Sequence, residues 1–575
     1  MSIQTQFAYR SSSELEVWNA PPNAGLCENF KKHTTSVKSI KYTPSGDLFA
    51  CIHADSIQIY KTSNYELTAS IERSGIVDTK FSPMGTYLMT WERFVKSEGD
   101  SVHRNLCVWT ALTGELVASY TQKAQSNCFL QWTHDESHCA KMVNNEVHFY
   151  KAPGFGDKVA MKLVMAGASY FSISPGRSPA VGVFVPEKNG APARVAIFYL
   201  GSFKIPVANK TFYRADRVEM VWNKLGTSMI LITHTDVDKT NKSYYGESRM
   251  YFLATSGNFD CAISLKKDGP IHDVEWNPAE KEFAVVYGYM PPRTSLFDHR
   301  GKEIFDFGEA HRNYASFNPH GRVLLIGGFG NLSGDVDLWE RKTLKKIATF
   351  NENGASICEW SPDGRYILAA TLSPRLRVDN GIRVWHYSGE LVYKKEINEL
   401  FQVQWRPETV EKFPQRASLS PAPKHLVIES KPLKPVAEVK SSYVPPHLRN
   451  VAGKNPGAGA SAVPGSNPQP EKKSGAKRNR KKSKKPKEKE GDDNSDAQPP
   501  APANGNGPSS SPAPSEQSSV VDVSKRLRNL EKKLTQIRGL KKKKDSGVEL
   551  DAAQEKKLAN EGDILKEIKE LSQKK

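Results

Sequence analysis

Eleven cations crowd into a short run near the C-terminal end of the chain, EKKSGAKRNRKKSKKPKEKE, where only Glu488 stands among them as an acid. They are Lys472, Lys473, Lys477, Arg478, Arg480, Lys481, Lys482, Lys484, Lys485, Lys487 and Lys489. Basic segments bind polyanions by releasing counterions from phosphates, which gives sequence-independent, salt-sensitive dissociation constants of roughly 10⁻⁴ to 10⁻⁶ M. We therefore predict contact with RNA. A nuclear import signal and a merely solvated stretch are the alternatives.

Motifs that would make the chain an enzyme are missing from the sequence. It contains no GxxxxGKS/T loop to cradle a nucleoside triphosphate, and no HExxH or GxSxG motif. The nearest approach to a metal cluster is His134, His138 and Cys139, but the histidines flank an expected turn and structural zinc normally takes four ligands. We interpret all three as turn and core residues, and we predict no catalysis, no cofactor and no metal.

A second set of candidate RNA-binding residues lies in four long polar segments, at 93–104, 234–248, 288–293 and 372–381. Arginine and lysine can contact phosphates there, and tyrosine offers a stacking surface for bases. The residues concerned are Lys239, Lys242, Tyr244, Tyr245, Arg293, Arg375 and Arg377. The alternative is that these segments are ordinary solvated loops, which are polar in any case.

The elements that must position these loops repeat along the chain. Nine short apolar strands each end in an aromatic residue, and successive aromatics lie 41 to 53 residues apart. They are Trp18, Tyr60, Trp109, Tyr150, Tyr199, Phe252, Phe297, Trp339 and Trp385. This spacing is typical of four-stranded propeller blades and is too wide for helical-repeat or leucine-rich arrays.

Nine strand-ending turns run in register with these strands, among them FSPMG at Pro83 and WSPDG at Pro362. Proline followed by Gly, Asp or Asn favours a tight turn, so each should end the innermost strand of a blade. The last turn, at Pro407, has no aromatic-ended strand after it, and the first such strand has no turn before it. We therefore predict an all-β, nine-bladed, WD-repeat-like propeller, with eight blades as the alternative. Residues 399–407 should close the ring by pairing with N-terminal strands, which removes open sheet edges.

The predicted blades place the four polar segments together. All four fall between the second and third strands of a blade, and in a propeller these connections open on one face. The usual stiffening residues of WD repeats are mostly replaced, because the Gly-His pair is missing and only Phe297–Asp298 keeps the aromatic-Asp dipeptide. The hydrogen-bond network of such blades should therefore be absent or rebuilt.

Composition divides the chain into a folded body and a basic tail. Hydrophobic residues make up 38% of the chain, below the 45 to 50% typical of globular domains, and the deficit is local. Residues 421–575 carry 33 Lys and Arg against 19 Asp and Glu, whereas the first 420 residues carry 48 against 44. We predict a propeller over 1–415, a disordered Pro/Ser/Lys-rich linker over 416–518 and a helical segment over 519–575.

The compartment follows from other features of the sequence. Seven cysteines are scattered without a CxxC pair, the first ten residues have neither an apolar nor a basic leader, and no run of 18 apolar residues occurs. We expect a cytoplasmic protein that does not contact membranes.

The helical segment begins with an apolar stripe at heptad spacing, at Val520, Val523, Leu527, Leu530, Leu534 and Ile537. Ser546 and Glu549 form a capping box for a second helix, which repeats the stripe at Leu558, Leu565, Ile568 and Leu571. Two and a half heptads are marginal alone, so the stripe needs a partner. Either the two helices form a self-contained hairpin, or the first helix binds another protein.

Taken together, the degenerate propeller, the linker motif SSYVPPHLRN and the lysine-rich tail resemble the eukaryotic translation initiation factor 2A family across essentially the whole chain. The motif residues are Tyr443, Pro445, Pro446 and Arg449. The resemblance implies a single polypeptide that binds the small ribosomal subunit and promotes initiator methionyl-tRNA delivery without its own GTPase cycle. The propeller would face the ribosome, and the tail would contact mRNA and other initiation factors. The alternative function is a WD-repeat protein-interaction scaffold whose tail tethers nucleic acid or directs localisation.

Overall fold

A computed structural model describes residues 4–31, 36–96, 103–155, 158–235, 247–423 and 427–429, together with five residues nearer the C-terminus. The chain divides into two units, Met1–Tyr443 and Val444–Lys575. The described residues of the second unit, Ile537, Glu561, Gly562, Leu565 and Lys566, are helical. None of the described residues belongs to a helix with the length and apolarity needed to span a bilayer.

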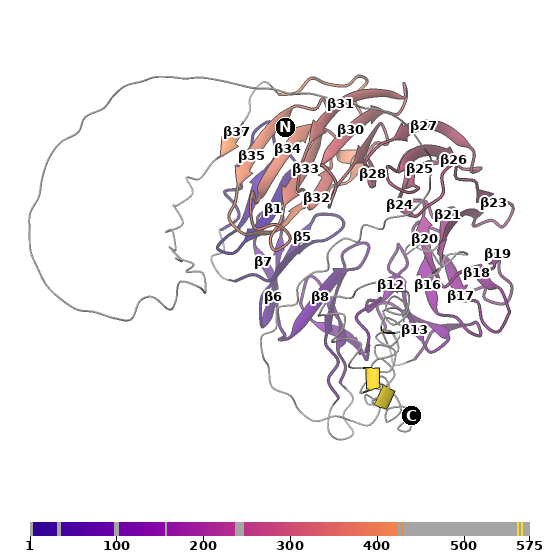
Figure 1. The fold of residues 1–575 in the computed structure, drawn as a ribbon. Helices are drawn as coiled ribbons and strands as arrows, with labels where there is room; N and C mark the ends of the chain where they lie inside the picture. The colour runs from indigo at the N-terminus through magenta and orange to yellow at the C-terminus, as the bar shows by residue number, and fades with distance from the viewer. Residues whose placement is uncertain are drawn as a thin grey trace, which may run out of the picture. The chain divides into compact units, whose positions relative to one another are not determined.

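The first unit is a ring of nine antiparallel sheets, which confirms the predicted nine-bladed propeller (Figure 1). Around the centre, first strands of neighbouring sheets contact one another in four places: β24 with β28, β28 with β32, β12 with β16 and β36 with β4. In ring order from blade 1 to blade 9, these innermost strands are β36 (Leu400–Trp405), β4 (Ser39–Tyr42), β8 (Ile76–Phe81), β12 (Gln131–Trp132), β16 (Tyr170–Ile173), β20 (Arg217–Trp222), β24 (Ile271–Trp276), β28 (Tyr314–Phe317) and β32 (Ile357–Trp360).

The second and third strands form the middle of each blade and carry most of the core. The second strands are β1 (Gln6–Ser11), β5 (Leu48–Ile52), β9 (Tyr87–Glu92), β13 (His138–Val143), β17 (Ala180–Val185), β21 (Ser228–His234), β25 (Glu282–Tyr287), β29 (Val323–Gly327) and β33 (Tyr366–Thr371). The third strands are β2 (Leu15–Asn19), β6 (Ser56–Lys61), β10 (Leu106–Thr110), β14 (Glu146–Lys151), β18 (Ala193–Tyr199), β22 (Ser248–Ala254), β26 (Arg293–Asp298), β30 (Asp335–Glu340) and β34 (Gly381–His386). All nine periodic aromatics lie in these third strands, as predicted.

The outer strands are β3 (Gly25–Leu26), β7 (Leu67–Glu72), β11 (Leu116–Tyr120), β15 (Met161–Val164), β19 (Ala208–Phe212), β23 (Asp260–Ile263), β27 (Glu303–Glu309), β31 (Lys345–Asn351) and β35 (Leu391–Glu396). Blade 9 has a fifth strand, β37 (Val427–Glu429), which pairs with β35 in parallel.

The ring closes between the two ends of the propeller sequence, as predicted. Strand β36 pairs with β1, where Trp405 lies opposite Phe7, and β1 pairs with β2, where Phe7 lies opposite Trp18. The Phe7 and Trp405 rings meet edge to face at 5.6 Å between centroids. Because both rings are buried in one apolar cluster, closure is held by packing as well as by the backbone ladder.

Hydrogen bonds between blades replace the missing WD-repeat network. Five tryptophans that end innermost strands donate their indole N–H to the preceding blade. Three donate to backbone carbonyls: Trp276 to Val221 at 3.0 Å, Trp360 to Ser316 at 3.1 Å and Trp405 to Glu359 at 3.3 Å. The other two donate to side chains, Trp132 to Met89 Sδ at 3.3 Å and Trp222 to the Ser172 hydroxyl at 2.9 Å. Where a tryptophan precedes the turn, it therefore also ties two blades together. We expected the hydrogen-bond network of WD repeats to be absent or rebuilt. It is rebuilt, as hydrogen bonds between neighbouring blades.

The strand order defines two faces of the ring. Connections between second and third strands open on one face, here called the loop face, and turns after innermost strands open on the other, the turn face. The four polar segments all join a second to a third strand, and their described residues therefore lie on the loop face, as predicted.

Residues 406–423, here called the strap, cross the turn face after the ring has closed. They include the short 3₁₀ helix η1 (Val410–Lys412), and Tyr387 on blade 9 hydrogen-bonds the Ser420 hydroxyl at 2.8 Å. The Tyr387–Ser420 hydrogen bond and the pairing of β37 lie beyond residue 415, the end that we predicted for the propeller.

Candidate RNA interface

Many of the sequence-predicted residues lie outside the described residues. These are the eleven tail cations, the linker motif at Tyr443, Pro445, Pro446 and Arg449, the helix positions Val523, Leu527, Leu530 and Leu534, and the loop residues Lys239, Lys242, Tyr244 and Tyr245. Ile537 is helical. The structure therefore places three of the predicted loop residues, Arg293, Arg375 and Arg377.

Arg375 and Arg377 are exposed on the loop face, in the connection between β33 and β34. This connection is anchored at both ends: the Ser373 N–H donates to the Leu400 carbonyl at 2.7 Å, and the Asn380 side chain donates to the Leu376 carbonyl at 2.7 Å. Within the described ranges, neither arginine forms an ion pair. Both guanidinium groups are therefore available to an anionic partner.

The connection between β33 and β34 belongs to blade 9 but lies next to residues of blade 8. A Cβ at Gly330 would lie 3.2 Å from the Arg375 guanidinium, and Arg375 lines a hollow of about 380 Å³ with Tyr314 and Phe329. The two rings meet edge to face at 5.7 Å, and Phe329 stays partly exposed. Sequence reasoning missed this ring, although its setting in the glycine-rich stretch GGFGNLSG marks an insertion on the same face.

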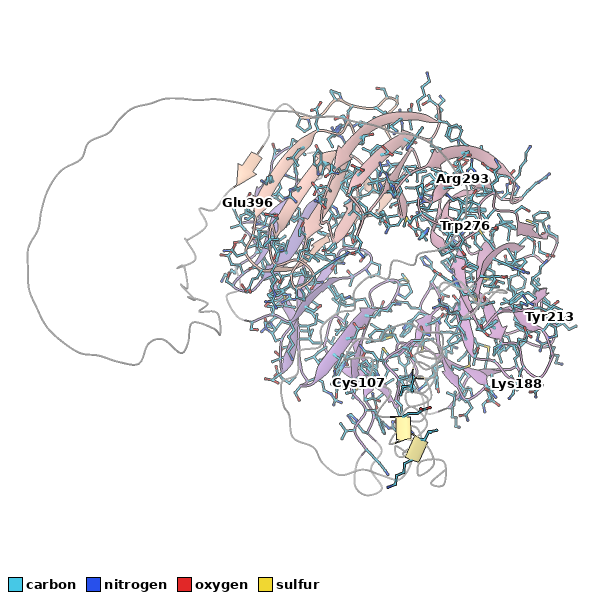
Figure 2. All side chains as sticks on the ribbon, in the orientation of Figure 1. Cys107, Lys188, Tyr213, Trp276, Arg293 and Glu396 are labelled. Atoms are coloured by element: carbon cyan, nitrogen blue, oxygen red, sulfur yellow. The ribbon has the colours of Figure 1, made fainter. Side chains whose placement is uncertain are left out.

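Arg293 has different surroundings, because its guanidinium is already paired. It donates to Asp306 on the neighbouring strand β27 at 2.9 Å from Nε and 2.5 Å from Nη2, and Glu309 lies 3.9 Å away. This pairing holds the pKa of Asp306 below its ordinary value. Figure 2 labels Arg293 on its blade. A phosphate would have to compete with these carboxylates, so Arg293 is a weaker candidate than Arg375 or Arg377.

The segment that contains Arg293 offers other exposed groups. Tyr289 and Met290 keep 45% and 48% of their surface exposed beside Arg293. A tyrosine on a loop can stack on an unpaired base, so Tyr289 belongs among the candidates that sequence reasoning missed.

The residues considered for metal binding differ in burial. Cys139 is fully buried in β13, and His134 is exposed in the preceding turn. No group of three His, Cys, Asp or Glu side chains within the described part of the chain is arranged to hold a metal ion.

The innermost strand β24 carries two acidic side chains, Asp273 and Glu275, and Asp273 links this blade to the next. Asp273 accepts the Ala315 N–H of the next blade at 2.8 Å. Burial, with a smaller effect from Asp273, raises the pKa of Glu275 from 4.5 to about 7.

Comparison with known proteins gives the family. The family described as "Eukaryotic translation initiation factor eIF2A" matches residues 210–403. A relative from Schizosaccharomyces pombe named "Eukaryotic translation initiation factor 2A" is 38% identical over 99% of both chains. The chain belongs to the eukaryotic translation initiation factor 2A family. A second factor 2A, from Dictyostelium discoideum, is 33% identical over 93% of this chain and 86% of its own.

A solved structure of a eukaryotic initiation factor shares both fold and sequence with this chain. The crystal structure described as that of "the eukaryotic initiation factor" superposes with a TM-score of 0.66 at 40% identity and covers 71% of this chain and all of its own. The family's role in translation initiation therefore applies to this chain, and the resemblance inferred from the turns, the linker motif and the tail is confirmed.

Proposed function

We propose that the chain binds the small ribosomal subunit through its loop face and promotes delivery of initiator methionyl-tRNA without a GTPase of its own. Membership of the factor 2A family supports the setting in translation initiation. In this proposal the lysine-rich tail contacts mRNA, the C-terminal helices bind other initiation factors, and the protein works in the cytoplasm.

The observation that carries the proposal is the pair of exposed arginines beside a partly exposed ring. Arg375 and Arg377 have no carboxylate partner among the described residues, and Phe329 lies next to Arg375 in the same hollow. Guanidinium groups can donate two hydrogen bonds to one phosphate, and an aromatic ring can stack on a base. Ribosomal RNA presents both chemistries at its surface loops.

The tail would add affinity rather than selectivity. A basic run neutralises phosphates without reading sequence, whereas the anchored loop between β33 and β34 presents its cations in one geometry. Two weak sites joined in one chain can gain about 10² to 10⁴ in apparent affinity. The loop face would therefore select the subunit, and the tail would prolong its residence.

The double variant Arg375→Gln with Arg377→Gln tests the loop face in the full-length chain. We expect binding to purified small subunits to weaken roughly tenfold or more, because two charge-assisted contacts are lost. The matched control neutralises Arg300 and Lys302, which are exposed on the turn face between β26 and β27. Equal affinities of the loop-face variant and the parent chain would contradict the proposal and favour the scaffold alternative.

A further inference from the structure

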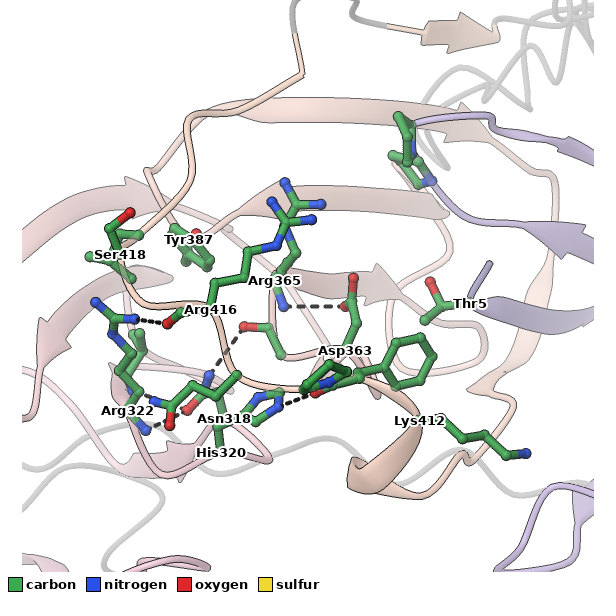
Figure 3. Close-up of a pocket in the computed structure, with 18 of the residues that line it drawn as sticks. Thr5, Asn318, His320, Arg322, Asp363, Arg365, Tyr387, Lys412, Arg416 and Ser418 are labelled. Atoms are coloured by element: carbon green, nitrogen blue, oxygen red, sulfur yellow. Dashed lines mark hydrogen bonds between the residues drawn. The ribbon is translucent and has the colours of Figure 1, made fainter. Parts of the chain in front are cut away.

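The turn face has its own hollow, of about 480 Å³, beside the strap. Four distant segments meet there: Thr5 ahead of β1, Asn318 and His320 in the turn of blade 8, Asp363 and Arg365 in the turn of blade 9, and Arg416 in the strap (Figure 3). We call this hollow the strap pocket. Its volume lies within the range of small-molecule sites and exceeds the needs of a lone anion.

Hydrogen bonds to the strap backbone fix one wall of the strap pocket. His320 Nε2 lies 2.6 Å from the Phe413 carbonyl oxygen, and Arg322 donates to the Arg416 carbonyl at 2.8 Å. Arg322 also pairs with Glu340 at 3.3 Å. The backbone of Arg416 is therefore held in place by these partners, while its side chain remains exposed.

Two guanidinium groups in the strap pocket have no counter-charge. Within the described ranges, neither Arg365 nor Arg416 forms an ion pair, and the buried Nε of Arg365 has no acceptor. Figure 3 shows the Arg416 side chain extending from the strap toward the end of the pocket where Arg365 lies. Their charges also act on the same buried neighbour, His386. Burial is the main cause that lowers the pKa of His386, to about 4, and the positive charges of Arg365 and Arg416 lower it further.

Acidic groups do little to balance these cations. The one carboxylate among the described lining residues, Asp363, accepts the Ser361 hydroxyl and the Arg365 backbone N–H, the latter at 3.2 Å. His386 is neutral near pH 7 and its buried Nε2 has no partner in the described chain. Two like charges held at one site repel each other unless an anion bridges them.

The remaining lining fits a nucleotide. Phe413 and His320 contribute partly exposed rings to the walls, and such rings stack on bases, whereas the Tyr387 ring is buried against His386. A second hollow continues past Arg322 and Arg416 to the exposed Lys342, alongside Glu280. This second hollow offers a path for the rest of an RNA strand. A pocket closed on all sides would admit a free nucleotide but not a nucleotide within a strand.

We propose that the strap pocket binds one nucleotide of a single-stranded RNA, with its phosphate between Arg365 and Arg416. This site is on the face opposite the loop face and does not depend on how the small subunit is bound. It would let the propeller hold two RNA segments at once, one on each face.

The test uses the full-length chain with the eleven tail cations changed to glutamine, so that binding by the tail does not mask the pocket. The probe is a fluorescein-labelled short oligouridylate, measured by anisotropy, with and without a terminal phosphate. We expect Arg365→Gln with Arg416→Gln to weaken binding roughly tenfold or more, because a bidentate charged contact is lost. Preference for the phosphorylated end would identify a strand terminus as the source of the phosphate, and equal binding would identify an internal phosphodiester.

Controls separate this site from the proposed function. Neutralising Arg300 and Lys302 removes the same charge from the turn face outside the strap pocket, and we expect less than about a twofold change from it. Arg375→Gln with Arg377→Gln is added to the tail-neutralised parent chain in every arm of this assay, so that RNA binding by the loop face does not mask the pocket. Equal losses in the pocket and control variants would overturn the strap pocket while leaving subunit binding by the loop face untouched.

Position is tested by photocrosslinking the same chain to thiouridine-containing RNA. Crosslinks should map to Phe413 or His320 and disappear in the pocket variant. Crosslinks confined to other residues would overturn the proposal, as would capture of a phosphoserine peptide in place of RNA. If the double variant melts early, Arg416→Gln alone provides the test, because Arg416 is exposed and its structural contact is made by its backbone.

Discussion

Arg293 and Arg375 are the same residue type in the same kind of connection, yet only one of them is available to a ligand. Arg293 faces Asp306 across the β26–β27 ladder, and Arg375 lies over the backbone of Gly330. The difference depends on which side chain stands opposite after folding. Counting cations in a sequence therefore overestimates binding residues wherever a neighbouring strand supplies a carboxylate.

Glu275 leads to a prediction at the residue scale. Its pKa of about 7 lies above the ordinary 4.5, so the folded chain binds more protons than the unfolded chain between these values. Stability should fall as pH rises through this window. Glu275→Gln should raise the free energy of unfolding at pH 8 by up to about 3 kcal/mol, since one pKa unit corresponds to about 1.4 kcal/mol, and should change little at pH 4.

The measurement is chemical denaturation of both chains across this pH range. Glu28→Gln, at an exposed position, controls for the loss of one negative charge. A pH-independent difference between the parent chain and Glu275→Gln would show that the carboxyl is not destabilised by burial.

Among the elements, the turns after the innermost strands form the joints of the ring. Gly46 in the turn of blade 2 has φ +73°, and its carbonyl accepts the Arg406 side chain of blade 1 at 3.0 Å. A Cβ there would lie 1.8 Å from the Pro407 carbonyl oxygen. The turn is therefore restricted both by backbone conformation and by the closing strand next to it.

Gly46→Ala should destabilise the propeller more than Gly75→Ala. Both glycines have left-handed φ values, +73° and +75°, so both changes incur backbone strain of about 1 kcal/mol. Nothing lies within 4 Å of a Cβ at Gly75, whereas at Gly46 the neighbouring backbone must move. We expect a further loss of about 1 to 3 kcal/mol at Gly46, measured by thermal melting. Equal melting midpoints for the two variants would mean that the backbone between blades 1 and 2 can move to accommodate the added Cβ at little cost.

The innermost and third strands were predictable because each carries a local signal. A turn follows the former, with proline in seven of the nine blades, and an aromatic ends the latter, and both signals recur at blade spacing. Strand β37 was not predictable, since three residues have no period and pair in parallel with a strand more than 30 residues earlier. The strap pocket was hidden for a similar reason, because Thr5, His320, Arg365 and Arg416 become neighbours only when the ring closes.

On the scale of the whole molecule, the chain joins a ring with two distinct faces to a strongly basic tail. The first 420 residues carry nearly balanced charge, so the basicity of the chain belongs mostly to the tail. In the proposed complex, the surfaces of the ring would hold their side chains in a fixed arrangement for binding RNA, and the tail would attract RNA electrostatically from a distance. These contributions differ in their response to salt, which makes them separable.

Changing the eleven cations between Lys472 and Lys489 to glutamine should weaken binding to small subunits and flatten its dependence on salt. Each phosphate contact that is lost reduces the slope of log affinity against log salt by about 0.7 to 0.9. Co-sedimentation from low to moderate salt measures both quantities. An unchanged slope would remove the tail from the interface.

Deleting residues 1–11, and with them β1, should abolish cooperative folding of the propeller. The deletion leaves β36 without its partner and removes Phe7 and Tyr9 from the buried cluster at the closure. Removing residues 444–575, which lie outside the propeller unit, is the control and should leave the melting transition in place. A deleted chain that melts like its parent would show that eight blades can form a stable ring.

Closure by the two ends of the propeller also dictates an order of events during synthesis. Strands β1 to β3 leave the ribosome first, but β36, the partner of β1, is made about 400 residues later, after all the other strands of blades 1 to 9 except β37. At 5 to 20 residues per second, the first strands wait roughly 20 to 80 s with one edge unpaired. During that interval a nascent chain exposes a sheet edge that can pair with another chain, so chaperone protection of the N-terminus should matter most in the first minute of its life.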